Sequence, residues 1–120
     1  MTTDRMLAQL TVQDLDDAVA WYARLFGRGP DARPMPGLAE WYPADAFGVQ
    51  VWAEPERAGR STVVLGETDL DERVASLDRA GIRHDPPQQA TSFRIVLLTD
   101  PDGNRIVFTG PPDHQVSTAD

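Results

Sequence analysis

Few side chains of this sequence can act as nucleophiles or metal ligands. The 120 residues include no cysteine, two histidines, and eleven basic residues that are all arginine. These counts exclude thiolate metal sites, cysteine nucleophiles, Schiff-base lysines and the phosphate-binding loop that ends in Gly-Lys-Ser or Gly-Lys-Thr. A histidine-rich metal site is close to excluded as well. We expect both His84 and His114 to be surface residues.

Aspartates offer the other ligands, but their setting indicates a structural role. Asp100 and Asp102 have the spacing of paired metal ligands. The run Asp100-Pro-Asp-Gly103 is nevertheless typical of a tight turn, because proline presets one backbone dihedral and glycine supplies a positive φ. No Ser-His-Asp constellation is visible either, since neither histidine has a partner that the sequence can place.

The charge balance narrows the class of partner. Nineteen acidic and eleven basic residues give a net charge of −8. Phosphate binding needs clustered basic groups, so we expect no nucleic acid partner, whereas cationic small molecules are favoured over anionic ones. The first residues lack the pattern of a secretory signal, and no apolar run approaches the length of a membrane span. We therefore expect a cytoplasmic protein without membrane contact.

The elements that must position these residues occur twice. Residues 14–25 and 69–80 are identical at six of twelve positions, at an offset of 55 residues. Each segment has an aspartate that can cap a helix, and its apolar residues recur at three- and four-residue steps. Each follows an extended segment and precedes a loop and two more extended segments, which indicates an internal duplication.

The expected fold class is α+β, with two βαβββ modules in one domain over residues 1–120. The modules cover about residues 6–53 and 61–109, and residues 110–120 form a polar tail. The predicted strands are residues 6–12, 38–42, 47–53, 61–66, 93–99 and 104–109, with one short edge strand in each of the proline-rich segments 29–36 and 84–90. One helix covers one face of each four-stranded sheet, so the second module, a partner chain or a ligand must cover the other face. A cleft between curved sheets follows as an expectation.

Three stretches of this sequence resemble the vicinal oxygen chelate superfamily, which includes glyoxalase I, extradiol dioxygenases, and the bleomycin and fosfomycin resistance proteins. They are residues 10–22, residues 69–82, and Asp100-Pro-Asp-Gly-Asn-Arg-Ile-Val-Phe108. The resemblance implies paired βαβββ modules around a cleft, often in a homodimer. Function differs widely within such a superfamily and must be argued from the site.

Enzymes of this superfamily usually hold a divalent metal with histidine and glutamate side chains, and the corresponding positions here lack those residues. By resemblance these positions are Leu7, Gln50, Thr62 and Val107. Leucine and valine have no donor atoms, and neutral threonine and glutamine oxygens alone hold a catalytic divalent ion too weakly. We therefore expect no metal and no other cofactor.

The expected ligand-binding cleft combines these positions with polar and aromatic neighbours. Strand alternation, with the metal positions setting the phase, predicts that Leu7, Gln9, Thr11, Trp41, Gln50, Trp52, Thr62, Val64, Arg94, Val96, Arg105 and Val107 face inward. Ile95, Leu97, Ile106 and Phe108 are then expected under the helix. Trp41 and Trp52 would suit a flat, partly polar small molecule, although tryptophan is also a common core residue. Arg94 would bind a carboxylate or phosphate, or else pair with one of the acidic residues of the chain.

Three functions remain open. The preferred one is metal-independent binding of an aromatic or cationic small molecule by a homodimer, as in bleomycin-resistance-type sequestering proteins. The alternative is a glyoxalase-like lyase or isomerase, or a dioxygenase, with an atypical site. The base of such an enzyme would be Glu40, Glu54 or Glu67, and Glu54 is preferred. Each of the three glutamates is otherwise expected to be solvated. The third is a module that binds another protein, which no feature of the sequence selects.

Overall fold

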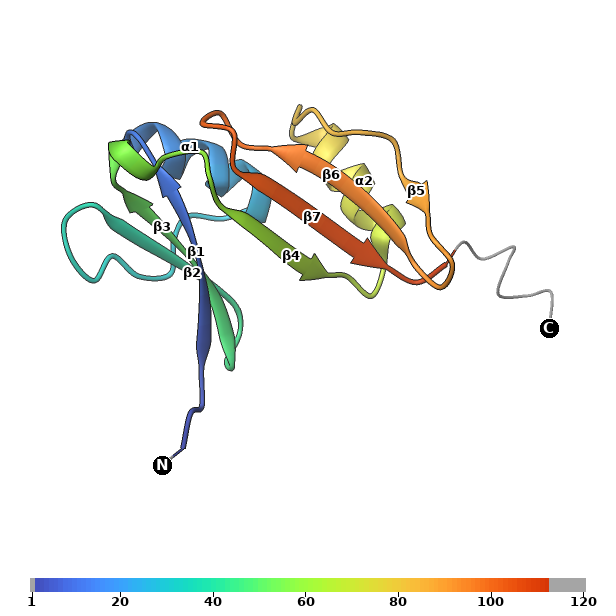
Figure 1. The fold of residues 1–120 in the computed structure, drawn as a ribbon, viewed down its shortest axis with the longest axis horizontal. Coiled ribbons are helices and arrows are strands. Elements are labelled where there is room, and N and C mark those ends of the chain that lie inside the picture. The colour runs from blue at the N-terminus through green and yellow to red at the C-terminus, as the bar shows by residue number, and fades with distance from the viewer. Residues whose placement is uncertain (1, 113–120) are drawn as a thin grey trace. The chain divides into compact units, whose positions relative to one another are not determined.

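The computed structural model describes residues 2–112, and within this range the chain forms two α-helices, seven strands and a short 3-10 helix (Figure 1). In chain order the elements are β1 (Met6–Val12), α1 (Leu15–Phe26), β2 (Leu38–Ala44), β3 (Phe47–Ala53), η1 (Pro55–Arg57), β4 (Thr62–Gly66), α2 (Leu70–Arg79), β5 (Gln88–Gln89), β6 (Arg94–Thr99) and β7 (Arg105–Gly110). Neither α1 nor α2 is long and apolar enough to cross a membrane. Most of the expected tail, residues 113–120 with His114, lies outside the described residues.

The two helices begin and end as their sequences predict. The carboxylate of Asp14 accepts a hydrogen bond from the backbone N–H of Asp17, and Asp69 accepts the equivalent bond from Glu72, both at 3.0 Å. Each bond satisfies one backbone donor that the first turn of a helix leaves free. Gly27 ends α1 with a φ of 75°, a conformation that costs glycine little.

Both sheets share one strand order, which confirms the two βαβββ modules. The first sheet runs β1-β3-β2, and an isolated bridge between Ala32 and Glu40 adds the expected edge segment beyond β2. The second sheet runs β4-β7-β6-β5. In the first sheet β1 is parallel to β3, and β2 is antiparallel to β3. The first strand of each module therefore pairs with the last, as the duplicated sequence requires.

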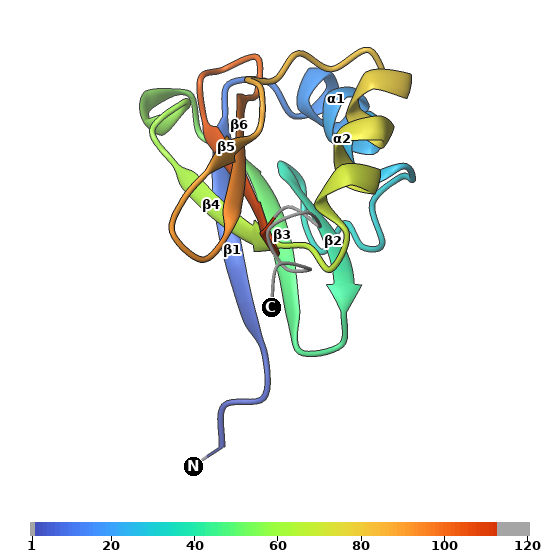
Figure 2. The same ribbon diagram turned by 90° about the vertical axis from the view of Figure 1, so that its right-hand side faces the viewer.

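One face of each sheet is covered by the helix of its own module. In the first module Trp41 is fully buried. The centroid of its ring lies 6.0 Å from the ring centroid of Tyr22 and 5.6 Å from that of Phe26, and both of these residues are on α1. In the second module α2 runs along one face of the sheet, as Figure 2 also shows. The core there is formed by Val63, Leu70, Leu77, Ile82, Val96, Leu98, Ile106 and Phe108.

The chain forms two compact units that do not coincide with the two modules. Of the described residues, one unit contains 2–63 together with Asp100–Arg105, and the other contains Val64–Thr99 together with 106–112. The turn between β6 and β7 therefore belongs to the first unit. Its Asp100 is buried and accepts a 2.8 Å hydrogen bond from the hydroxyl of Tyr22. The structural role expected for Asp100 is confirmed by this contact.

Candidate functional site

Polar side chains form a row across the helix-free face of the first sheet. Gln9 lies opposite Gln50 in the β1–β3 register, and Glu40 lies opposite Gln50 in the β2–β3 register. Trp41 packs against α1, and successive side chains of a strand point to opposite faces, so Glu40 and its partners face away from the helix. Register and alternation together bring three amide and carboxyl groups into line.

Hydrogen bonds join this row end to end. The Nε2 of Gln9 donates to Oε1 of Gln50 at 3.1 Å, and Nε2 of Gln50 donates to Oε2 of Glu40 at 2.5 Å. From the other side the hydroxyl of Tyr42 donates to Oε1 of Glu40. We call Gln9, Gln50, Glu40 and Tyr42 the polar row. Its hydrogen bonds all run toward the carboxylate of Glu40, which is the terminal acceptor.

Glu40 is a buried carboxylate whose partners are neutral. Its residue surface is 5% exposed, and within residues 2–112 it forms no ion pair. The hydroxyl of Tyr42 and the amide of Gln50 donate hydrogen bonds to this carboxylate, but neither donor carries a charge that would neutralise it. Its hydrogen bond with the Tyr42 hydroxyl is the main cause that raises the pKa of that phenol. The arrangement is therefore electrostatically suited to a positively charged group.

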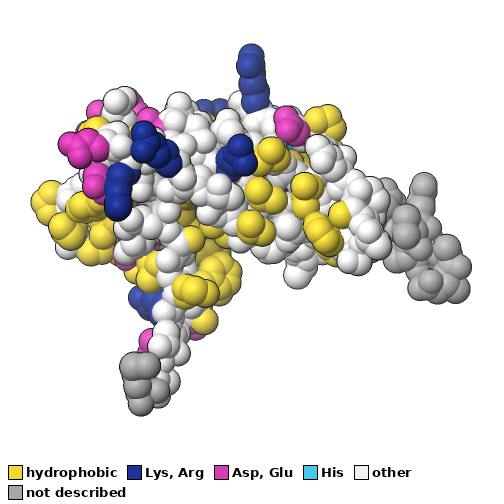
Figure 3. All heavy atoms as spheres, in the orientation of Figure 1, with side chains coloured by type: hydrophobic (Ala, Val, Ile, Leu, Met, Phe, Trp, Pro, Cys, Tyr) yellow, Lys and Arg dark blue, Asp and Glu magenta, His cyan; other side chains and the backbone are white. Residues whose placement is uncertain are grey.

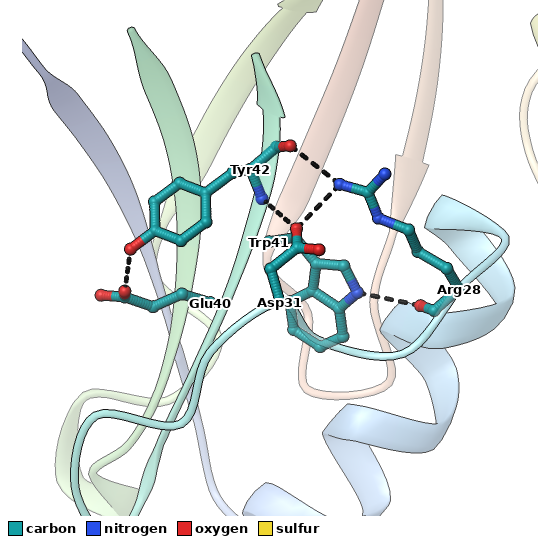
Figure 4. Close-up of polar contacts among 5 residues, drawn as sticks. All are labelled: Arg28, Asp31, Glu40, Trp41 and Tyr42. Carbon is teal, nitrogen blue, oxygen red and sulfur yellow. Dashed lines mark hydrogen bonds and ion pairs between the residues drawn. The ribbon is translucent and has the colours of Figure 1, made fainter. Parts of the chain in front are cut away.

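The segment after α1 holds Tyr42 in place, as Figure 4 shows. Oδ2 of Asp31 accepts a 2.7 Å hydrogen bond from the backbone N–H of Tyr42. A guanidinium nitrogen of Arg28 lies 2.7 Å from the same oxygen and donates a 2.8 Å hydrogen bond to the carbonyl oxygen of Tyr42. The backbone hydrogen bond from Tyr42 is the first cause that lowers the pKa of Asp31. Trp41 donates from Nε1 to the carbonyl of Arg28 at 2.9 Å. These contacts fix β2, the strand that carries both Glu40 and Tyr42.

Trp52 extends the helix-free face with aromatic surface. It lies two residues after Gln50 on β3, so both side chains point to the same side of the sheet. Trp52 is half-buried, and its Nε1 donates to Oε1 of Glu54 at 3.2 Å. The structure thus brings five of the expected cleft residues onto one face: Leu7, Gln9 and Thr11 on β1, and Gln50 and Trp52 on β3.

The structure places Trp41 on the opposite face, so its expected position in the cleft is wrong. Trp41 pairs with Val49, whereas Glu40 pairs with Gln50. The reason is a bulge between Trp41 and Ala44. Continued unbroken from the Ala44–Phe47 pair, the register would have placed Trp41 opposite Gln50.

The predicted phase of β6 is also wrong by one residue. Val96 is fully buried, whereas Ile95 and Leu97 are only half-buried. Arg94 turns to the helix side, where its guanidinium lies 3.1 Å from the carboxylate of Asp71 at the start of α2. The ion pair with an acidic residue, the alternative reading of Arg94, is the one that the structure supports.

The other expected site residues do not take part in the polar row. Leu7 is half-buried on β1. Thr11 is buried, and its backbone carbonyl accepts a 2.7 Å hydrogen bond from Nδ2 of Asn104. On the second sheet Thr62 and Arg105 are exposed, Val64 is 61% exposed, and Val107 is half-buried. Ile106 and Phe108 are buried as predicted.

The donor set does not fit a catalytic divalent metal. Gln50 donates its amide nitrogen to Glu40 and accepts from Gln9 with its oxygen, so it is engaged in the polar row. Leu7 and Val107 have no donor atoms. Within residues 2–112, no group of three or more histidine, aspartate or glutamate side chains is placed to hold a metal ion.

The sequence identifies no role for Tyr42, and it names Glu40 only as a candidate base that is expected to be solvated. The burial of Glu40 corrects that expectation. Glu54 accepts from Trp52, and Glu67 pairs with Arg73 at 3.4 Å. The Gln9–Gln50 pair indicates that the next strand presents a partner to Gln50, but only the bulge in β2 makes that partner Glu40 rather than Trp41.

Comparison with known proteins agrees with the fold. A family model described as a glyoxalase-like domain matches residues 7–109. The solved structure of a glyoxalase/bleomycin resistance protein from Catenulispora acidiphila is similar, with a TM-score of 0.84, 29% identity, and coverage of 90% of this chain and 98% of that chain.

Two further solved structures each have a TM-score of 0.76 and 26% identity. One is a bleomycin resistance determinant encoded on the transposon Tn5, which covers 91% of this chain and 98% of its own. The other is a bleomycin-binding protein in complex with bleomycin, which covers 90% of this chain and 98% of its own. None of the curated proteins compared matches this chain.

Proposed function

Because this chain belongs to the glyoxalase-like domain family, we propose that it is a cytoplasmic small-molecule-binding protein that sequesters an aromatic or cationic compound without a metal. The observation that carries the proposal is the buried carboxylate of Glu40, which has neutral hydrogen-bond partners and faces away from the helix. A ligand cation would supply the missing counter-charge.

The surroundings of Glu40 support the same class of ligand. Gln9 and Gln50 provide amide groups that can fix the orientation of a polar ligand, and the half-buried Trp52 provides a flat apolar surface. Aromatic area with a few placed polar groups is the usual composition of a small-molecule site. A structural neighbour named as a bleomycin-binding protein also supports this reading.

Calorimetry tests the binding function directly. Bleomycin, benzamidine and neutral aromatic compounds are titrated into protein that has been treated with a chelator and analysed for bound metal. We expect at least one cationic compound to bind and to be recovered with unchanged mass. Absence of binding across the panel, or binding that needs an added divalent ion, would contradict the proposal.

A charge-neutral substitution connects the binding to Glu40. Glu40→Gln keeps the shape of the side chain and removes its charge, so we expect about ten- to hundredfold weaker binding of the cation, the range for loss of a charge-assisted hydrogen bond. Glu56→Gln is the matched control, because Glu56 is exposed on η1 and the substitution changes the net charge equally. Equal effects of the two substitutions would mean that Glu40 is not the counter-charge.

We further propose that the protein is a homodimer. The helix-free face of the second sheet carries apolar side chains: Val64 is 61% exposed, and Ile95, Leu97 and Val107 are half-buried. Figure 3 shows hydrophobic side chains gathered over this sheet. A face of this kind favours association with another surface. Light scattering reports the mass of the particle, and a monomer at micromolar concentration would contradict this part of the proposal.

A second candidate function is acid–base catalysis by the same residues, as in a glyoxalase-like lyase or isomerase. The hydrogen bond between the phenol of Tyr42 and the buried carboxylate of Glu40 favours it, because such a pair can exchange a proton with a bound substrate. Recovery of a chemically changed compound from the calorimetric panel, abolished by Glu40→Gln, would support catalysis over sequestration.

A further inference from the structure

An arginine of the chain itself lies on the aromatic end of the polar row. The guanidinium carbon of Arg5 is 4.6 Å from the ring centroid of Tyr42, which is the geometry of a cation–π contact. The hydroxyl of the same ring donates to Glu40. Tyr42 thus contacts a cation with its face while its hydroxyl contacts a buried carboxylate.

The position of Arg5 in the chain explains how it reaches this ring. Arg5 immediately precedes β1, and the backbone N–H of Met6 donates to the carbonyl of Ala46 at 3.0 Å, in the turn that connects β2 and β3. This bond anchors the start of β1 beside the hairpin that carries Tyr42. Arg5 is exposed, and within residues 2–112 it forms no ion pair, so its contact with Tyr42 can be given up at small cost.

We propose that the Tyr42 ring and the Glu40 carboxylate form a subsite for a planar cation, a guanidinium or amidinium, and that Arg5 occupies its aromatic face in the free protein and competes with the ligand. The inference rests on the proposed binding function and names the chemical class of the ligand at that site. A planar cation can stack on an aromatic face and donate in its own plane to a carboxylate. Tyr42 supplies the ring face, and Glu40 supplies a carboxylate that accepts from the hydroxyl of the same ring. Arg5 uses the first of these groups and leaves the second without a counter-charge.

The competition makes a quantitative prediction. An exposed cation–π contact is weak, so its removal should tighten binding of a cation by about two- to fivefold. The probe is benzamidine, a flat amidinium, and its neutral isostere benzamide is the ligand control. Binding to wild type and to Arg5→Ala is followed by NMR titration. The midpoints of thermal unfolding of the two proteins are compared first.

Arg60→Ala is the matched protein control. Arg60 is exposed in the same unit, and its loss makes the net charge more negative by the same amount as the loss of Arg5. We expect Arg5→Ala to bind benzamidine more tightly than Arg60→Ala does, with no such difference for benzamide. We also expect benzamidine to shift the Tyr42 ring resonances in wild type. Equal affinity of the two variants for benzamidine would overturn the inference.

The outcomes separate this inference from the proposed function. If benzamidine binds wild type and Glu40→Gln weakens that binding, but Arg5→Ala behaves as Arg60→Ala does, the binding function stands and the competition by Arg5 is wrong. If neither benzamidine nor any compound of the calorimetric panel binds wild type or Arg5→Ala, both are wrong. Binding of benzamide and benzamidine with equal affinity would overturn the cation subsite alone.

Discussion

The hydroxyl of Tyr22 on α1 donates a 2.8 Å hydrogen bond to Oδ2 of Asp100, a buried contact between residues 78 positions apart. Asp100 also accepts from Nδ2 and the backbone N–H of Asn104, both at 2.8 Å, and from the backbone N–H of Asp102 at 3.0 Å. Nδ2 of Asn104 donates in turn to the carbonyl of Thr11 on β1. The turn after β6 thereby becomes part of the first unit and joins the strand that carries Gln9.

Removal of the Tyr22 hydroxyl should destabilise the fold. Tyr22→Phe keeps the ring that packs on Trp41 but leaves buried Asp100 short of one donor, so we expect a loss of about 1–3 kcal/mol in the free energy of unfolding, measured with urea. Asp100→Asn should also destabilise strongly. Asp102→Asn is its matched control, since the side chain of Asp102 accepts a long 3.4 Å bond from the backbone N–H of Gln13. A free energy of unfolding unchanged by Tyr22→Phe would contradict the role of this contact.

Gly59 should not tolerate a side chain. Its φ is 82°, and a Cβ atom at this position would lie 2.1 Å from the carbonyl oxygen of Asp102. We expect Gly59→Ala to lower the free energy of unfolding by more than about 1 kcal/mol. Gly29→Ala is the control, because nothing lies within 4 Å of its added Cβ and its φ is not positive. Similar urea midpoints for the two variants would contradict this reading of the Gly59 contact.

His84 should make stability dependent on pH. Its side chain is 13% exposed rather than fully at the surface, and its two ring nitrogens lie 2.8 Å from the carbonyl of Asp85 and 2.8 Å from the carboxylate of Asp78. Both partners accept hydrogen bonds and therefore favour the protonated ring. The hydrogen bond with Asp85 is the main cause that raises the pKa of His84 above its ordinary value of 6.5, and Asp78 adds to it.

The sign of the effect follows from proton linkage. Because the folded pKa is the higher one, the stabilisation is complete below pH 6.5 and is lost as the pH rises through the folded pKa. The difference in unfolding free energy between wild type and His84→Gln should therefore shrink from pH 6 toward higher pH. Asp78→Asn should reduce this pH dependence, and a difference that is constant with pH would contradict the prediction.

Two tryptophans should respond differently to the same substitution. Trp41→Phe creates a void beside α1 and removes the hydrogen-bond donor of the Arg28 carbonyl. We therefore expect a loss of about 1–3 kcal/mol in the free energy of unfolding. Trp52→Phe should cost less but should remove most of the fluorescence change on ligand binding. Retention of that change in Trp52→Phe and its loss in Trp41→Phe would mean that the ligand contacts the other face of the sheet.

Local sequence patterns predicted the elements of this fold well because the forces involved are local. The caps at Asp14 and Asp69 and the turn that starts at Asp100 depend on residues within four positions of each other. The repeated segments also predicted the matching strand order, since each module must pair its first and last strands in the same way.

Sequence alone therefore determined the duplicated βαβββ architecture, the family, and the absence of metal donors at Leu7 and Val107. Only the tertiary structure decided which side chains share a face. One bulge between Trp41 and Ala44 shifts the pairing by a residue, buries Trp41 under α1, and places Glu40 opposite Gln50. The period of a strand is two, so a shift of one exchanges its faces, and no local pattern in a strand with apolar residues on both sides records that choice.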